Sequence, residues 1–191
     1  MRKILGIDID GVITKEGTGN ENIWLQKLRE HTGRKLERKK DKYDFTKAFD
    51  LTQQEVEDFV EQNIKEIYAN LPPAEGACEV LEELSKKNFT LYLITARHRE
   101  YKPITREWLQ DNKITYNELY HSKEKAPLAE KLGVELFIED HQKNTEQILK
   151  TGIPVIIVDK YHNREIESPM IWRATSWKEI QDIILNYYNI T

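Results

Sequence analysis

The sequence predicts an α/β fold in three layers, with a parallel sheet between two layers of helices and a small helical cap inserted after the first strand. Short, continuous apolar runs rich in isoleucine, valine and leucine predict the sheet, because strands buried on both faces have this pattern. Apolar stripes at helical spacing between the runs predict the helices. The first two runs are too far apart for one crossover, which predicts the cap. The runs are Ile4–Ile9, Phe89–Ile94, Leu136–Ile138 and Ile153–Val158.

Four amphipathic helices are predicted between and after these strands. Pro103 suits the first turn of the second helix, and Gly133 follows the end of the third. Strands that alternate with helices in this way imply right-handed crossovers between parallel strands. The four stripes consist of Ala77, Val80, Leu81 and Leu84; Ile104, Trp108 and Leu109; Leu128 and Leu132; and Ile180, Ile183, Ile184 and Tyr187.

The cap is predicted from the length of the first crossover. Asp10 and Thr95 are 85 positions apart, whereas a strand–helix–strand unit needs about 30 residues. The sequence Leu71-Pro72-Pro73 marks the return to the core, because a pair of prolines cannot continue a helix. We therefore expect a core formed by residues 1–14 and 72–191 and a cap formed by residues 15–71.

Two helices are predicted within this cap. The sequence Thr52-Gln53-Gln54-Glu55 is a capping-box pattern, and apolar residues follow it at helical spacing as far as Tyr68. An earlier helix is expected over Glu21–His31, with Trp24 on its apolar face.

Composition limits the classes of function. The chain has 191 residues, with 29 Lys and Arg against 33 Asp and Glu, so its net charge of −4 argues against nucleic acid as a partner. Its one cysteine, Cys78, excludes an internal disulfide and any multi-cysteine metal site. No apolar stretch approaches the roughly 20 residues that span a membrane. Asp8 interrupts the first apolar run too early for a signal peptide, so we expect a cytoplasmic protein.

An acidic motif follows the first predicted strand directly. In Asp8-Ile9-Asp10-Gly11-Val12, the two aspartates are two residues apart, so both carboxylates can reach one site beyond the strand. Gly11 permits the sharp turn that follows. Two carboxylates so close together repel, and they need a cation, a proton or a hydrogen-bonding turn. By itself the motif is as consistent with an acidic turn as with a catalytic site.

Three further polar residues are predicted at the same edge of the sheet. Thr95 ends the second buried run, and Asp140 ends the run that begins at Leu136. Lys125 lies near the start of a helix, and it is preferred to Lys123 as the ammonium group of the site. Carboxyl ends of parallel strands meet at one edge, so these groups are expected to converge there.

In order and context these positions resemble the haloacid dehalogenase superfamily, whose members are mostly phosphatases and have a Rossmann-like core. The resemblance covers nearly the whole chain and extends to the 5′(3′)-deoxyribonucleotidase-like branch and its small bacterial relatives. Asp8 and Asp10 match the first motif of the superfamily, Thr95 the second, Lys125 the third and Glu139-Asp140 the fourth. Similarity to the branch is carried by Leu136–Asn144, Ile153–Arg164 and Trp177–Ile180.

This resemblance implies a phosphomonoester hydrolase that works through an aspartyl-phosphate. Asp8 is expected to attack phosphorus as a carboxylate nucleophile. Asp10 is expected to protonate the leaving alkoxide and then to activate water. Dehalogenases of the superfamily lack an acid at the second position and P-type ATPases carry threonine there, so an aspartate favours hydrolysis.

Mg²⁺ is the expected cofactor, because it suits a site of few carboxylates, waters and a substrate phosphate. The resemblance implies that the carboxylates of Asp8 and Asp140 and the backbone carbonyl of Asp10 bind it. Glu139 either supports the groups that bind the metal without binding it directly, or merely finishes the strand.

The resemblance also implies which groups hold the phosphate. They are the Thr95 hydroxyl, the Ala96 backbone N–H and Lys125, which offsets negative charge on Asp8 and the phosphoryl group. Deoxyribonucleotidases continue with Ser-Pro after the threonine, whereas this chain continues with Ala96-Arg97-His98-Arg99. Arg97 either holds phosphate in place of the missing serine or, as we expect, is exposed at a helix start.

The remaining aromatic and histidine residues carry weaker signals. Tyr43 and Phe45 are candidates to stack on a nucleobase, whereas Trp24 lies on an apolar stripe and is expected in the core of the cap. The five histidines show no metal-binding spacing and are expected at the surface; they are His31, His98, His121, His141 and His162.

The expected partner is therefore a small phosphorylated metabolite, with a nucleoside or deoxynucleoside monophosphate preferred. The alternatives are a phosphatase of sugar phosphates or other small metabolites, a phosphotransferase, and a binding module that keeps the fold without turnover. Phosphate release from a panel of substrates distinguishes these alternatives. A binding module releases no phosphate, and the best substrate of an enzyme separates a nucleotidase from a sugar-phosphate phosphatase.

Overall fold

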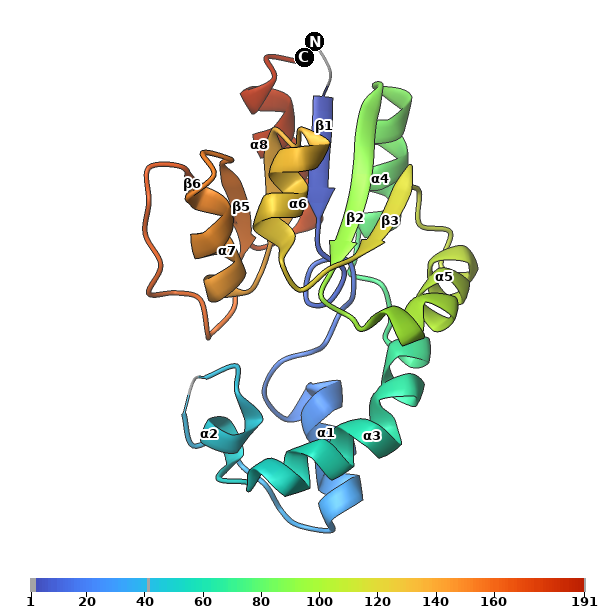
Figure 1. The fold of residues 1–191 in the computed structure, drawn as a ribbon, viewed down its shortest axis with the longest axis vertical. Helices are drawn as coiled ribbons and strands as arrows, with labels where there is room; N and C mark the ends of the chain where they lie inside the picture. The colour runs from blue at the N-terminus through green and yellow to red at the C-terminus, as the bar shows by residue number, and fades with distance from the viewer. Residues whose placement is uncertain (1–2, 41, 191) are drawn as a thin grey trace.

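The computed structural model describes residues 3–40 and 42–190, so the outermost residues of the expected core lie outside the described part. Its centre is one sheet of six parallel strands in the order β3-β2-β1-β4-β5-β6. This confirms the predicted α/β class (Figure 1). The strands are β1 (Lys3–Ile7), β2 (Phe89–Thr95), β3 (Glu118–His121), β4 (Leu136–Glu139), β5 (Val155–Val158) and β6 (Ile171–Ala174).

The two edge strands, β3 and β6, were not predicted. Each has four residues, of which only Leu119 of β3 and Ala174 of β6 are buried. An edge strand is covered by a neighbour on one side only, so it does not need the continuous apolar run that marks the inner strands. The four inner strands, which have that run, lie close to their predicted positions.

Helices cover both faces of the sheet and complete the three layers (Figure 1). Leu81, Trp108 and Ile180, from α4, α5 and α8, pack in one apolar cluster with β1 and β2. Ala129 and Ile148, from α6 and α7, belong to a second cluster. The helices are α4 (Ala77–Lys86), α5 (Lys102–Asp111), α6 (Lys125–Leu132), α7 (Gln142–Leu149) and α8 (Trp177–Tyr187), and short 3-10 turns cover Gly19–Glu21 and Arg99–Tyr101.

Strand β1 ends earlier than its apolar run. The run continues to Ile9, but the strand ends at Ile7, and a tight turn follows in which Val12, Ile13 and Thr14 all donate backbone hydrogen bonds to the Ile9 carbonyl. The extra apolar residues are still buried, because the turn folds back into the core. A tight turn therefore follows the central strand directly, and the acidic motif lies in it.

The described residues of 15–40 and 42–71 form three α-helices with an apolar cluster of their own. Leu28, Phe59 and Ile67 are buried in this cluster. The predicted capping box is present, since Thr52 accepts from the Glu55 backbone N–H and Glu55 accepts from the Thr52 backbone N–H. The helices are α1 (Ile23–Thr32), α2 (Phe45–Phe49) and α3 (Gln53–Asn70), of which α2 is too short for its periodicity to predict.

Two chain segments connect this helical insertion to the sheet, and they lie side by side. Thr14 and Pro73 form an antiparallel β-bridge. The Trp177 indole N–H donates to the Val12 carbonyl at 3.0 Å, and the Trp108 indole N–H donates to the Leu71 carbonyl at 2.6 Å. The insertion thus lies beyond the carboxyl ends of the strands (Figure 1). Among residues 3–40 and 42–190, no helix has both the length and the hydrophobicity to cross a membrane.

Candidate active site

Asp8 is the first residue after β1 and is almost fully buried. Its backbone N–H donates to the Ile138 carbonyl of β4, which places the residue between two central strands. Its Oδ1 accepts from the Ile9 backbone N–H at 2.8 Å, and its Oδ2 lies 2.7 Å from Lys125 Nζ. The carboxylate is therefore held in one orientation at the carboxyl edge of the sheet.

Lys125, at the start of α6, is buried between two carboxylates. Its ammonium group lies 2.7 Å from Asp8 Oδ2 and 2.8 Å from Glu139 Oε2. The other oxygen of Glu139 accepts from the His141 backbone N–H and from Asn144 Nδ2, at 3.2 and 2.9 Å. Glu139 therefore orients Lys125, and Lys123, the other candidate, is exposed.

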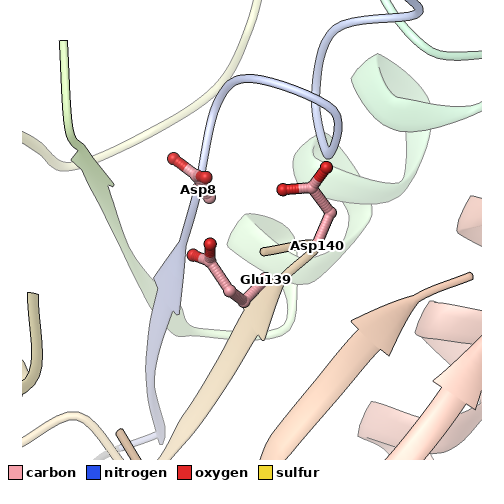
Figure 2. Close-up of side chains that lie close together, drawn as sticks. All are labelled: Asp8, Glu139 and Asp140. Carbon is pink, nitrogen blue, oxygen red and sulfur yellow. The ribbon is translucent and has the colours of Figure 1, made fainter. Parts of the chain in front are cut away.

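Asp140 lies beside the turn that follows β1. Its carboxylate lies against Gly11, so a Cβ at position 11 would collide with it. Gly11 also has a φ of +72°, a conformation that side chains disfavour, so two independent constraints require glycine here. One carboxylate oxygen from each of Asp8, Glu139 and Asp140 lies within 4.8 Å of the others (Figure 2).

These three carboxylates, with Lys125, carry an unbalanced charge. Burial raises the pKa of Asp8 to about 8, with a further contribution from Glu139 that Lys125 only partly offsets. Burial, then Glu139 and Glu16, also raise the pKa of Asp140. When all three carboxylates are ionised, they exceed the one ammonium by two negative charges, which a divalent cation would neutralise. The Asp140 carboxylate accepts no hydrogen bond from the described residues, so its oxygens are available as metal ligands.

The carboxylate of Asp10 is paired with an arginine. Arg97 Nη2 lies 2.7 Å from Asp10 Oδ1 and Arg97 Nε lies 2.9 Å from Asp10 Oδ2, which makes the pair bidentate. The expectation that Arg97 is exposed is wrong, because the residue is only 3% exposed. Its guanidinium lies 3.8 Å from the centre of the Tyr68 ring of α3 and donates to Thr105. A buried arginine is stable here because its charge is paired with Asp10.

Thr95 and Ala96 follow at the carboxyl end of β2, next to β1. Thr95 is fully buried, its hydroxyl accepts from the Arg97 backbone N–H at 3.2 Å, and its carbonyl accepts from the Ser122 N–H. Ala96 is exposed. The predicted site residues therefore lie at the carboxyl ends of the neighbouring strands β2, β1 and β4. Lys125 is the first residue of α6.

The structure adds residues that the sequence pattern did not indicate. The expectation that the histidines lie at the surface is wrong for His162, whose side chain is 5% exposed and whose Nε2 lies 3.7 Å from Asp140 Oδ2. Burial, followed by His141, lowers the pKa of His162 to about 4. Asn163 holds this loop in place by donating to the carbonyls of Asp140 and Val158, at 2.6 and 2.8 Å. The sequence offered one indication of these two residues: they follow the carboxyl end of the predicted strand that became β5.

A cavity of about 450 Å³ adjoins these residues. Two of its lining side chains contact the residues described above: Tyr68 stacks on Arg97, and His162 lies beside Asp140. Trp24 was expected in the core of the insertion; it is half-buried and lines the cavity, donating to Glu16 Oε1 at 3.0 Å. Other lining residues include Asn22, Arg38, Tyr43, Phe45, Val56, Val60, Ile64 and Tyr161.

Comparison with known families and proteins identifies relatives along the whole chain. The sequence model of the family described as "5' nucleotidase, deoxy (Pyrimidine), cytosolic type C protein" matches residues 2–189. The protein "Putative nucleotidase YqfW" of Bacillus subtilis (strain 168) is 33% identical over 186 residues, covering 92% of this chain and 90% of its own. "Nucleotidase CA_C3379" of Clostridium acetobutylicum is 27% identical over 181 residues, covering 93% and 91%.

Solved structures with the same fold are more distant in sequence. A haloacid dehalogenase-like family hydrolase from Streptococcus pneumoniae superimposes with a TM-score of 0.68 at 14% identity, covering 98% of each chain. A haloacid dehalogenase superfamily hydrolase, subfamily IA, from Geobacter sulfurreducens gives a TM-score of 0.62 at 18% identity, covering 96% of each chain. At these identities the likeness establishes the fold alone.

Proposed function

The chain belongs to the family of 5′ nucleotidase, deoxy (pyrimidine), cytosolic type C proteins, and from this premise we propose that it is a Mg²⁺-dependent hydrolase of nucleoside or deoxynucleoside monophosphates. We propose an aspartyl-phosphate on Asp8 as its intermediate. The observation that carries the proposal is the buried Asp8 carboxylate, with the Lys125 ammonium at 2.7 Å and the Asp140 carboxylate beside it. A nucleophile, a cation and a metal-binding acid thus meet at one point.

The donor set fits Mg²⁺. The Asp8 and Asp140 carboxylates and the Asp10 backbone carbonyl would hold the ion, and the carbonyl accepts no hydrogen bond from the described residues. Bound there, Mg²⁺ would neutralise charge on the phosphoryl oxygens. The raised pKa values of Asp8 and Asp140 support a cation at this place, because a cation favours their ionised forms.

The reaction then follows from this chain's own residues. An Asp8 carboxylate oxygen bonds to phosphorus while the bond from phosphorus to the leaving oxygen breaks, and Asp10, which is protonated at the start of this step, gives that oxygen its proton and becomes a carboxylate. In the second step Asp10 takes a proton from water as the water attacks phosphorus. The bond to Asp8 then breaks, and phosphate leaves. Lys125 offsets the negative charge near Asp8 in both steps.

The phosphate is proposed to lie between β1 and β2. The Thr95 hydroxyl and the Ala96 backbone N–H, both at the end of β2, would bind its oxygens. The serine that follows this threonine in deoxyribonucleotidases is replaced by Ala96. Arg97 does not substitute for that serine in the described state, since its guanidinium is paired with Asp10.

We propose that residues 15–71 form a cap over this site and that the nucleoside occupies the adjoining cavity. Tyr43 and Phe45 line the cavity, and Trp24 packs edge-on against Phe45 with ring centres 6.1 Å apart. Flat aromatic walls favour a planar base. The cavity of about 450 Å³ is also of the size that binds a small molecule. The descriptions of the relatives as nucleotidases support the same substrate class.

Phosphate release tests this proposal. We expect release from nucleoside monophosphates in Mg²⁺, and a fall on the order of 10²- to 10³-fold when a chelator removes the ion, because a metal stabilises transition-state charge by several kcal/mol. Sugar phosphates of similar size and a folded phosphoprotein serve as comparison substrates. A preference for sugar phosphates would replace the nucleotidase proposal by the sugar-phosphate alternative. Phosphate transfer to an added alcohol would indicate a phosphotransferase, and release from no substrate would favour a binding module.

A further inference from the structure

The pair formed by Arg97 and Asp10 links two segments 87 positions apart. The Arg97 side chain is fully buried, and the Asp10 side chain is 21% exposed. The guanidinium therefore has no access to water, whereas the carboxylate that it binds does. This asymmetry suits an arginine that serves the carboxylate beside it rather than a ligand from solution.

The geometry of the pair fixes the Asp10 carboxylate. Arg97 Nη2 and Nε donate to different oxygens of Asp10, at 2.7 and 2.9 Å, so the planes of the two groups are set by each other. A carboxylate on a turn would otherwise rotate among several orientations. The guanidinium occupies one edge of the carboxylate and leaves acceptor positions for a proton or a leaving oxygen.

Several elements hold Arg97 itself in place. Its Nη1 donates to Thr105 Oγ1 of α5 at 3.3 Å, and its carbonyl lies 3.0 Å from His121 Nδ1 of β3. From the insertion, Tyr68 of α3 places its ring 3.8 Å from the guanidinium carbon. Because the sheet, α5 and α3 all contact this residue, its position is determined by the assembled fold.

From these contacts we infer that Arg97 is a positioning residue, which holds the Asp10 carboxylate where it exchanges a proton with the leaving group. The inference rests on the proposed function, because it assumes that Asp10 is the general acid. The competing explanation is that the pair only stabilises the fold. The two explanations differ in how the loss depends on the leaving group.

Leaving-group dependence is measured with two substrates. An alkyl phosphate such as a nucleoside monophosphate needs protonation of its leaving oxygen, whereas p-nitrophenyl phosphate releases a stable phenolate that needs little. The comparison uses kcat/KM, which reports the steps up to the first phosphoryl transfer and excludes hydrolysis of the intermediate. The variants are Arg97→Gln, which removes the charge, and Arg97→Lys, which keeps the charge without the bidentate geometry.

For Arg97→Gln we expect kcat/KM to fall about 100-fold on the nucleoside monophosphate and less than about fivefold on p-nitrophenyl phosphate. Arg97→Lys should show the same pattern with a smaller loss, and it keeps the test valid should Arg97→Gln fold poorly. Asp10→Asn should lower kcat/KM on the nucleoside monophosphate at least as much as Arg97→Gln does, again with a much smaller loss on p-nitrophenyl phosphate. The matched control is Arg99→Gln, since Arg99 is exposed and two positions away, and it should leave both substrates unchanged.

Equal losses on both substrates would overturn the inference, because a purely structural role weakens every reaction alike. Unchanged kcat/KM on the nucleoside monophosphate in both Arg97 variants would also overturn it. Failure of the proposed function has a different signature, which is absence of phosphate release from either substrate by the wild-type protein.

Discussion

Replacing Asp8 by asparagine (Asp8→Asn) is expected to lower kcat for a nucleoside monophosphate by at least ~10⁴-fold, the scale found when a covalent nucleophile is removed. Asparagine has the same shape as aspartate, and its amide oxygen is a far weaker nucleophile than a carboxylate. Phosphate release in Mg²⁺ measures the effect. Asp111→Asn is the matched control, since Asp111 is exposed at the end of α5. Residual turnover within tenfold of wild type would mean that another group attacks phosphorus.

The same variant is expected to fold, and to differ from the wild type in its pH dependence. In the metal-free protein the pKa of Asp8 is about 8, against 3.8 in the unfolded chain. Between these pH values the folded state keeps a proton that the unfolded state has lost, so stability falls as pH rises. The pKa of His162 is lowered to about 4 in the folded state. Between pH 4 and 6.5 this residue therefore makes the stability rise with pH, which opposes the effect of Asp8.

Between pH 6.5 and 8 the His162 contribution is complete, and Asp140, whose pKa is also raised, acts in the same direction as Asp8. The contribution of Asp8 is therefore the difference between the wild type and Asp8→Asn. Chemical denaturation with chelator present should show the wild-type free energy of unfolding falling in this window, with up to about 1.4 kcal/mol per pH unit of the slope coming from Asp8. The fall should be smaller in Asp8→Asn. Equal slopes for the two proteins would show that Asp8 is already ionised in the metal-free fold.

Replacing Lys125 by methionine (Lys125→Met) is expected to destabilise the metal-free protein by about 3–5 kcal/mol, the cost of removing one partner from a buried ion pair. Methionine fills much of the same space, but Asp8 and Glu139 then face each other without the ammonium that lies 2.7 and 2.8 Å from them. Phosphate release by Lys125→Met should also fall, because no ammonium group then offsets the charge of Asp8 and the phosphoryl group.

Lys123→Met is the matched control for that variant. Lys123 is two positions away and exposed, so its replacement should change the free energy of unfolding by less than about 0.5 kcal/mol and leave turnover near wild type. Equilibrium denaturation and phosphate release measure both effects. If the two methionine variants behaved alike, Lys125 would have no special role.

The inner strands and the acidic edge were predictable because their signals are local. Burial on both faces requires continuous apolar residues, so β1, β2, β4 and β5 can be recognised in the sequence. Parallel strands place their carboxyl ends at one edge, and this rule brought Asp8, Thr95 and Asp140 to the same region before any contact was known.

The pairing of Asp10 with Arg97 was not predictable in the same way. An arginine beside a strand end is exposed in most proteins, and what buries this one is a carboxylate 87 positions away and a tyrosine from the insertion. His162 is a similar case, since its burial depends on Asn163 holding a loop against Asp140. Both environments come from tertiary contacts, which the local periodicity of the sequence does not indicate.

Trapping the intermediate tests the central claim most directly. The wild-type protein is mixed with a nucleoside monophosphate carrying a labelled phosphoryl group in Mg²⁺, the reaction is stopped in acid within one turnover, and the labelled peptide is mapped. We expect the label on Asp8 and none on the Asp8→Asn protein. A label on another residue, or release of phosphate at the wild-type rate with no labelled protein at any time, would contradict an aspartyl-phosphate at Asp8.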